Sequence, residues 1–168
     1  MRFGFCYTLY MPKSQNIALL FLRLTLGSLF LYAGITKLID PAWTSAGYLM
    51  GAKTMAGFYH WLASSQMIAS VDGINKWGLL LIGSALILGL ATRVASFLAI
   101  VLMALYYIPT FSFPYAGAHA YIVDEHIIYI AALCVLIVFR AGTFWGIDGA
   151  FDQLREAPAK IKNYLKSN

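Results

Sequence analysis

The sequence has few charged residues. Only 11% of its 168 residues are Asp, Glu, Lys or Arg, whereas 61% are hydrophobic. In soluble domains roughly a quarter of the residues are charged. A water-soluble fold of this composition would expose large apolar patches, which a lipid bilayer accepts. Because the length corresponds to one domain, we expect a single integral membrane domain over residues 1–168.

Cysteine is also scarce. The two cysteines, Cys6 and Cys134, form no CxxC motif, so the sequence contains no disulfide framework. We expect both thiols to be reduced and unpaired. Cys134 lies midway along an apolar run, and we expect it to pack as a small core residue.

Acidic residues number seven against twelve Lys and Arg, which gives a formal net charge of +5. The bases lie at the ends of apolar segments and in the C-terminal tail, not along one stripe, so the sequence does not indicate nucleic-acid binding. It also lacks the glycine-rich nucleotide motifs and the GxSxG motif. The basic excess instead agrees with a membrane protein that follows the positive-inside rule.

Apolar segments that can cross a bilayer cover residues 17–39, 76–91, 94–111 and 126–144. The second is short and borrows the interfacial Trp77. Residues 42–75 are aromatic but interrupted by glycines, which favours a helical segment lying in the membrane interface. Residues 149–168 form a basic, amphipathic tail. The predicted fold is therefore all-α: a membrane four-helix bundle with an interfacial helical segment between spans one and two.

The distribution of Lys and Arg predicts the orientation. Three of these residues, Lys37, Lys53 and Lys76, flank the spans on one side. Eight flank them on the other side, and they are Arg2, Lys13, Arg93, Arg140, Arg155, Lys160, Lys162 and Lys166. We expect a multi-pass protein of the cell membrane with both termini in the cytoplasm.

Arg23 lies within the first span, where an ionisable residue is rare. Its long side chain can reach back to the inner headgroups. Alternatively, it faces the bundle as a cation for an anionic or quinone-like ligand. The sequence leaves both interpretations open.

The outer ends of the spans collect several candidate functional residues. Lys37 and Glu125 can form a structural ion pair, or they can hold a small anion or protonate a reduced cofactor. His126 is a candidate proton carrier or an interfacial polar residue. The run from Asp124 to His126 resembles a metal site when His119 is added. No second helix offers a matching ligand pair, so we expect no metal.

Tyr106 and Tyr107 lie at the outer end of the third span. An aromatic belt at the membrane surface explains such residues. A flat ligand such as a quinone would also stack on them.

An ordered series of short motifs resembles the DoxX/DoxD-like family, and more closely its DoxD branch, the small membrane subunit of thiosulfate:quinone oxidoreductase. The motifs run from residue 20 to residue 150. They are Arg23-Leu24 with Gly27, Gly34-x-x-Lys37, Ser45-Ala46-Gly47-Tyr48-Leu49, Asn75-x-Trp77-Gly78 with Gly83 and Gly89, Thr92-Arg93, Tyr106-Tyr107-x-Pro109, Asp124-Glu125-His126 with Tyr129, and Gly146-x-Asp148.

The resemblance implies a prokaryotic four-helix membrane subunit that passes electrons from thiosulfate to the membrane quinone pool. It also implies a second small subunit and an association with a terminal oxidase complex. An alternative is a non-catalytic accessory subunit that stabilises a terminal oxidase or another respiratory complex. The candidate catalytic residues are Lys37, Glu125 and His126. The candidate quinone-binding residues are Arg23, Trp77, Arg93, Tyr106 and Tyr107.

Overall fold

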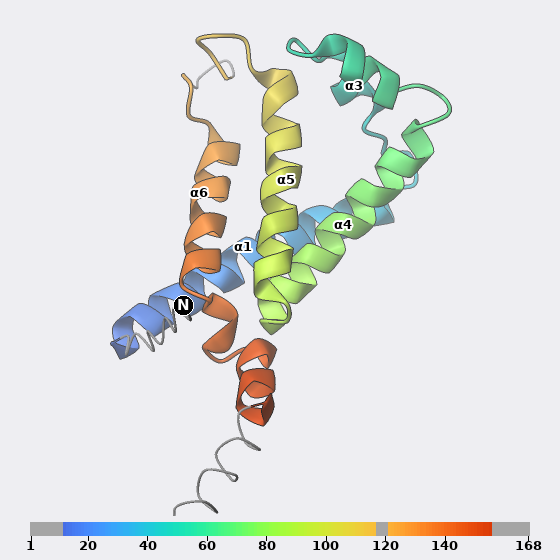
Figure 1. Cartoon of the computed structure of the whole chain (residues 1–168). Coiled ribbons are helices and arrows are strands. Elements are labelled where there is room, and N and C mark those ends of the chain that lie inside the picture. The colour runs from blue at the N-terminus through green and yellow to red at the C-terminus, as the bar shows by residue number, and fades with distance from the viewer. Residues whose placement is uncertain (1–11, 117–120, 156–168) are drawn as a thin grey trace, which may run out of the picture.

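The computed structural model describes residues 12–116 and 121–155, and this part of the chain contains helices and no named strand. The helices are α1 (Lys13–Ile39), α2 (Ala46–Met50), α3 (Ala56–Leu62), α4 (Ile68–Leu88), α5 (Thr92–Thr110), α6 (Glu125–Val138) and the 3₁₀ turn η1 (Ala141–Thr143). Residues 147–155 are also helical. The predicted all-α class is confirmed (Figure 1). Arg2, Cys6, His119 and the tail beyond residue 155 lie outside the described residues.

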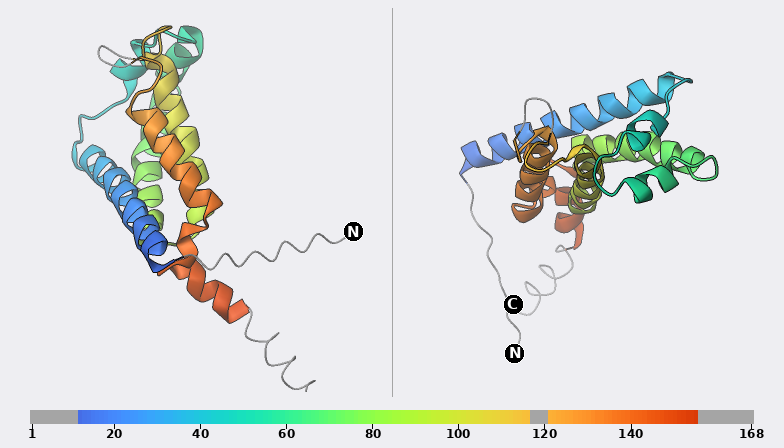
Figure 2. Two further views of the ribbon diagram at one scale, coloured as in Figure 1. Left: turned by 90° about the vertical axis from the view of Figure 1, so that its left-hand side faces the viewer. Right: turned by 90° about the horizontal axis from the view of Figure 1, so that it is seen from above.

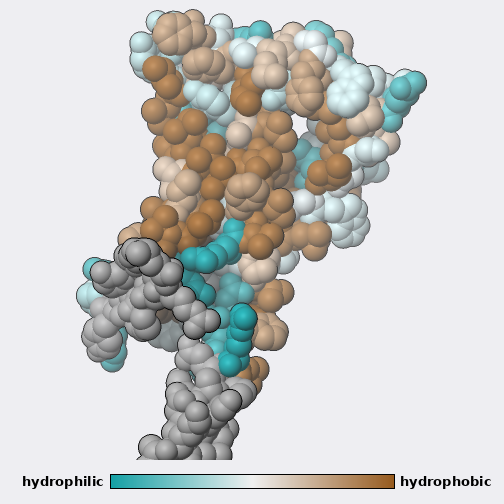
Figure 3. Space-filling model, in the orientation of Figure 1, coloured by the Kyte–Doolittle hydropathy of each residue, from teal (hydrophilic) through white to brown (hydrophobic). Residues whose placement is uncertain are grey.

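Three helices, α1, α4 and α5, are long and apolar enough to cross a membrane. The fourth apolar helix, α6, has 14 residues. Large hydrophobic side chains such as Phe21, Leu81 and Val138 are exposed on these helices. Figure 3 shows apolar residues covering most of the visible face between the two ends of the molecule. This surface suits contact with lipid tails, as expected for a membrane protein.

Two helix boundaries differ from those predicted. The second long helix, α4, begins at Ile68 and not near Lys76, because its early polar side chains have partners: Asp72 accepts hydrogen bonds from Ser45, and Asn75 accepts one from Lys37. The fourth helix ends at Val138 and does not continue to residue 144, since Arg140 adopts a left-handed backbone conformation with φ 49°.

The helices pack as two antiparallel pairs, α1 with α4 and α5 with α6, and α4 also packs against α5. In the view from above in Figure 2, α1 and α4 run side by side while α5 and α6 are seen nearly end on. The core between the pairs contains Phe30, Leu79, Leu86, Leu133 and Leu136, all buried. Cys134, which we expected in this core, is instead exposed on α6.

Small residues bring α1 and α4 into backbone contact. A Cβ atom added at Gly34 would lie 2.6 Å from the backbone nitrogen of Leu80, and one at Gly27 would lie 2.8 Å from a side-chain carbon of Ile87. Gly83 of α4 packs equally closely on the backbone of α1. Such close approach replaces the hydrophobic driving force that helices lack in lipid.

Arg23 lies at the end of the molecule where α1 begins and α6 ends. We call this end the Arg23 end. Its side chain is buried, with 1% of the residue exposed. The guanidinium donates hydrogen bonds to the carbonyl oxygens of Ala141 (2.8 Å), Phe144 (3.1 Å) and Trp145 (3.2 Å). These carbonyls follow the end of α6 and would otherwise lack donors. The interpretation that Arg23 reaches out to the headgroups is therefore wrong.

Asp148 completes the Arg23 end by capping α5. Its carboxylate accepts hydrogen bonds from the backbone nitrogens of Ala91 (2.7 Å) and Thr92 (2.9 Å), and its own N–H donates to Gly89 (2.9 Å). Gly89 has φ 66°, and a Cβ there would lie 2.6 Å from the Cα of Gly146. Residues from several of the family-like motifs, among them Arg23, Gly89 and Asp148, therefore lie together at the Arg23 end.

Candidate functional site

A cavity of about 820 Å³ lies at the opposite end of the molecule, where α1 and α5 end and α4 and α6 begin. We call this the Lys37 end. The volume falls within the range of small-molecule sites, roughly 300–1,000 Å³. Apolar and polar groups from every long helix and from α2 line it. The lining residues are Lys37, Trp43, Thr44, Ser45, Tyr48, Asn75, Tyr106, Thr110, Ala116, Asp124, Glu125 and His126.

Lys37 is the central cation of the cavity. Its ammonium donates hydrogen bonds to Asn75 Oδ1 (3.0 Å) and to the hydroxyl of Tyr106 (3.1 Å), and it lies 4.9 Å from the centre of the Trp43 ring. An ammonium has three N–H donors. One of them therefore has no hydrogen-bond partner among the described residues and is available to a ligand.

Lys37 does not form the ion pair with Glu125 that the sequence suggested. Among the described residues, Arg140 forms an ion pair with Asp152, and the Asp124 carboxylate contacts the His126 imidazole instead of a lysine. Glu125 is exposed and lines the cavity from the first turn of α6. The cavity therefore contains a cation and a carboxylate that do not neutralise each other by direct contact.

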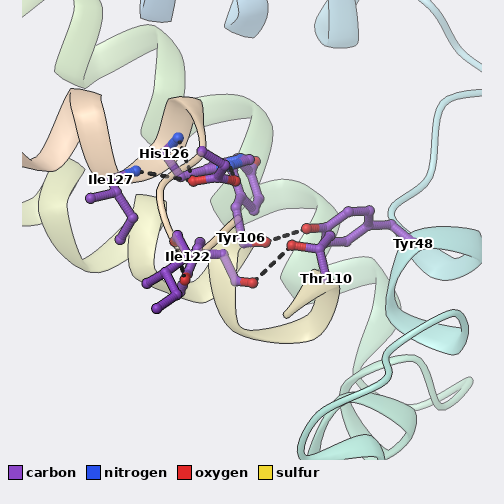
Figure 4. A network of polar contacts seen from close by, with 8 residues as sticks. Tyr48, Tyr106, Thr110, Ile122, His126 and Ile127 are labelled. Carbon is purple, nitrogen blue, oxygen red and sulfur yellow. Dashed lines mark hydrogen bonds and ion pairs between the residues drawn. The ribbon is translucent and has the colours of Figure 1, made fainter. Parts of the chain in front are cut away.

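His126 faces the ring of Tyr106 in a T-shaped arrangement, with 6.0 Å between the ring centres. Its Nδ1 lies 2.7 Å from a carboxylate oxygen of Asp124. The other carboxylate oxygen accepts hydrogen bonds from the backbone nitrogens of His126 (3.0 Å) and Ile127 (3.2 Å). Figure 4 shows this group beside Tyr106. The arrangement places an imidazole and a phenol on the same wall of the cavity.

Residues 42–67 close this end of the molecule by satisfying the carbonyls at the end of α5. Pro109 has no N–H, so the carbonyl of Leu105 lacks its helical donor. The hydroxyl of Tyr59, a buried residue, donates to that oxygen at 3.1 Å. The hydroxyl of Tyr48 donates to the carbonyl of Tyr106 (Figure 4). Unpaired carbonyls are costly in a membrane, which explains why this segment lies over α5.

Two further hydrogen bonds join residues 42–67 to the end of α5. The backbone N–H of Lys53 donates to the carbonyl of Pro109 at 2.8 Å, and the hydroxyl of Thr54 donates to the carbonyl of Phe111. Burial raises the pKa of the Tyr48 phenol to about 12, and burial also raises the pKa of Tyr59. Both hydroxyls therefore keep the protons that they donate at neutral pH.

The structure brings together four of the residues selected from the sequence: Lys37, Tyr106, Glu125 and His126. Sequence reasoning did not select Trp43, Tyr48 and Asn75 as site residues. Tyr48 and Asn75 lie in motifs that resemble the DoxD branch, and this resemblance is the feature of the sequence that could have identified them as site residues.

The other selected residues lie elsewhere. The Tyr107 hydroxyl donates to the carbonyl of Ile122 at 2.6 Å, and Trp77 is exposed on α4. Arg23 and Arg93 belong to the opposite end, where Arg93 lines a smaller cavity of about 240 Å³. Within residues 12–116 and 121–155, no group of three or more His, Cys, Asp or Glu side chains is arranged to hold a metal ion.

The family model described as DoxX matches residues 18–112. This region includes most of α1, all of α2 to α5, and the cavity residues Lys37, Asn75 and Tyr106. It ends before α6, which supplies the wall containing His126. No curated protein and no solved structure gives a significant match. Because the match covers more than half of the chain, this protein belongs to the DoxX family, whose members are generally membrane proteins.

Proposed function

We propose that this chain is the membrane subunit of a quinone oxidoreductase related to the DoxD branch, which receives electrons from thiosulfate and delivers them to the membrane quinone pool. The observation that carries the proposal is the cavity at the Lys37 end. It combines an imidazole and aromatic rings with an ammonium that contacts no carboxylate of residues 12–116 and 121–155.

The cavity residues fit a quinone headgroup. Its two carbonyl oxygens require hydrogen-bond donors. Lys37 of α1 offers an N–H group, and His126 of α6 offers one at Nε2 when its ring is protonated. The rings of Trp43 and Tyr106 offer surfaces for a flat ligand. A bound quinone supplies the chemistry of a two-electron, two-proton acceptor. Lys37 would stabilise negative charge on the ligand oxygen, and Glu125 and His126 would hold the protons that the reduction consumes.

Thiosulfate would approach from the aqueous side of the cavity. Lys37 and Lys76 lie on the same Trp43 ring, at 4.9 and 5.3 Å from its centre, and provide positive charge there. Two thiosulfate ions lose one electron each when an S–S bond joins them, which balances the quinone reduction. In the described part of the chain no cysteine lines the cavity, so the electrons would reach the quinone through a second small subunit.

The proposed membrane arrangement has four spans. At 1.5 Å per residue, α6 is about 21 Å long, so it needs residues 139–144 and the interface to cross a core of roughly 30 Å. Arg93, Arg140 and Arg155 lie on the Arg23 side, which would face the cytoplasm of a prokaryotic cell. The cavity and residues 42–67 would then face outward, with the covering segment at the membrane interface.

Quinone binding provides the first test. A short-chain quinone should quench the fluorescence of Trp43 in the purified protein in nanodiscs, and Trp43→Phe should remove that component. Lys37→Met should weaken binding by at least tenfold. Lys53→Met is the matched control, because it removes the charge of an exposed lysine at the same end. The backbone N–H of residue 53, which bonds Pro109, is unchanged. Equal binding by Lys37→Met and wild type would contradict the proposed site.

Turnover provides the second test. The protein purified with its partner subunit should reduce a quinone analogue when thiosulfate is added, and Lys37→Met should slow this reaction. A rate equal to the no-enzyme control at every pH from acidic to alkaline would exclude the oxidoreductase function.

An accessory role is the second candidate, because no cysteine among the described residues lines the cavity and Cys134 is exposed on α6. In that case the chain would stabilise a terminal oxidase or another respiratory complex without binding quinone. Co-purification with an oxidase whose activity is unchanged by Lys37→Met and Glu125→Gln would favour this role over the first.

A further inference from the structure

Asp124 makes contacts that exceed those of a simple helix cap. One carboxylate oxygen accepts from the backbone nitrogens of His126 and Ile127, as an N-cap residue does. The second oxygen lies 2.7 Å from Nδ1 of His126. The side chains of His126 and Asp124 are only 19% and 11% exposed. The capping bonds therefore fix the carboxylate in the orientation that faces the imidazole.

We propose that Asp124 is a positioning residue that keeps a proton on Nδ1 of His126 and leaves Nε2 as the atom that exchanges a proton with a ligand in the cavity. This rests on the proposed function, because the ligand oxygen is that of the quinone. The structure gives Nε2 no hydrogen-bond partner among the described residues, and His126 lines the cavity.

The proton balance follows from the geometry. A carboxylate only accepts hydrogen bonds, so Nδ1 must be the protonated atom in the pair. When the imidazole is protonated, Nε2 also carries a proton. Transfer of that proton to a reduced quinone oxygen breaks the Nε2–H bond, forms an O–H bond and leaves a neutral imidazole whose Nδ1–H still bonds Asp124. The carboxylate stabilises the cation before transfer and keeps the correct tautomer after it.

Charged and polar groups from several elements lie around this imidazole. Asp124 and Glu125 come from the start of α6 and line the same cavity as His126. Tyr106 of α5 contacts the ring edge-on, and Lys37 of α1 bonds the Tyr106 hydroxyl. Tyr48 of α2 lies beyond Tyr106. Among the described residues, Asp124 is the one whose side chain bonds the imidazole.

Asp124→Asn separates this role from helix capping, because Asn is as good an N-cap as Asp. The amide can still accept from His126 and Ile127, but it removes the negative charge beside Nδ1. Asp124→Ser is a second variant that can cap the helix. Asp152→Asn is the matched control, since it makes the same change in an exposed ion pair at the Arg23 end. Circular dichroism verifies that each variant remains helical.

Nitrogen-15 NMR of histidine-labelled protein in nanodiscs tests the positioning without any quinone. The chain has three histidines, and His126→Gln assigns the signal. Wild type and Asp152→Asn should show neutral His126 with the proton on Nδ1. Asp124→Asn and Asp124→Ser should move the proton to Nε2. The same Nδ1–H population in all four proteins would overturn the proposal.

The rate of quinone reduction tests the chemical consequence. Removing the carboxylate charge should lower the rate by at least tenfold, as the loss of general acid catalysis does. An unchanged rate in both Asp124 variants would overturn the proton-transfer role, even if the NMR signal moved. A wild-type protein that binds no quinone would instead refute the proposed function, and the NMR result would still decide whether Asp124 positions His126.

Discussion

Arg23 and Lys37 are both basic residues of α1, yet they have different surroundings. The Arg23 guanidinium donates hydrogen bonds to three backbone carbonyls, and these carbonyls follow the end of α6. Among the described residues, Lys37 contacts neutral groups, namely the Asn75 amide, the Tyr106 hydroxyl and the Trp43 ring, and it lines a cavity. The sequence identified both as unusual cations. It could not assign their roles, because the carbonyls that Arg23 binds lie more than a hundred residues away.

Arg23→Lys should destabilise the protein. A lysine presents its donors from one atom and loses the planar fork that reaches separate carbonyls. Each buried carbonyl left without a donor costs about 1–3 kcal/mol, so we expect a loss of roughly 2 kcal/mol or more. The thermal unfolding midpoint in detergent measures this effect. Arg93→Lys is the control, since Arg93 is exposed and should shift the midpoint little. Equal midpoints for the two variants would show that the Arg23 contacts are unimportant.

The titration of Tyr48 gives a pH-dependent prediction. Its pKa is raised to about 12 by burial, compared with the ordinary value of 10.0. The folded protein therefore binds more protons than the unfolded chain between about pH 10 and 12, so this contribution to stability is complete below pH 10 and lost as the pH rises through 12. Unfolding midpoints measured across this window should fall more steeply for wild type than for Tyr48→Phe. Parallel curves would contradict a desolvated, hydrogen-bonded Tyr48 hydroxyl.

At the scale of elements, the α1–α4 pair depends on glycines that sit against the neighbouring backbone. Gly83 and Gly78 both belong to α4, but only Gly83 faces α1, whereas a Cβ at Gly78 meets nothing within 4 Å. The glycine-rich motif in the sequence predicted close helix contact in this region. It could not say which glycine makes the contact, because either face of α4 contains one.

Gly83→Ala should therefore separate α1 from α4 and cost about 1–3 kcal/mol, as overpacking usually does. Gly78→Ala should be neutral or slightly stabilising, because alanine is the better helix former. Thermal unfolding of the two variants makes the comparison. A Gly78→Ala variant as unstable as Gly83→Ala would contradict the observed packing face.

Residues 42–75, whose glycines and aromatic residues suggested an interfacial helical segment, show what sequence reasoning missed between the first two long helices. The part from Ile68 onward belongs to α4. The structure shows short helices whose tyrosine and threonine hydroxyls satisfy carbonyls at the end of α5, including the Leu105 carbonyl freed by Pro109. Only the folded arrangement reveals that pairing. The same is true of Asn75, which the sequence placed in a family-like motif without showing that it accepts a hydrogen bond from Lys37.

At the scale of the whole molecule, the two ends have different tasks. The Arg23 end is closed by hydrogen bonds between helix termini, whereas the Lys37 end contains the cavity. The matched family region supplies the cavity residues of α1, α2, α4 and α5, and α6 supplies the remaining helical wall. The all-helical membrane class and the gathering of Lys37, Tyr106, Glu125 and His126 followed from hydropathy and from position at span ends. The separation of Arg23 and Arg93 from this group required the fold.

The proposed orientation predicts which residues an impermeant thiol reagent reaches in intact cells. With Cys6 and Cys134 replaced by serine, a Lys53→Cys variant should react from outside. An Arg93→Cys variant should react only after the membrane is permeabilised. Both positions are exposed in the fold, so accessibility reports the side of the membrane and not burial. The reverse pattern would invert the orientation.

Photoaffinity labelling shows directly whether the cavity at the Lys37 end binds a quinone. An azido-quinone irradiated with the full protein in nanodiscs, followed by peptide mass spectrometry, should label the residues around Trp43 at the end of α1, Tyr106 of α5 or His126 of α6. Excess unlabelled quinone should suppress this labelling, and Lys37→Met should reduce it. The contrary result is labelling that is confined to the lipid-facing surface or to the Arg23 end and that unlabelled quinone does not suppress. It would show that the cavity at the Lys37 end is not a quinone site.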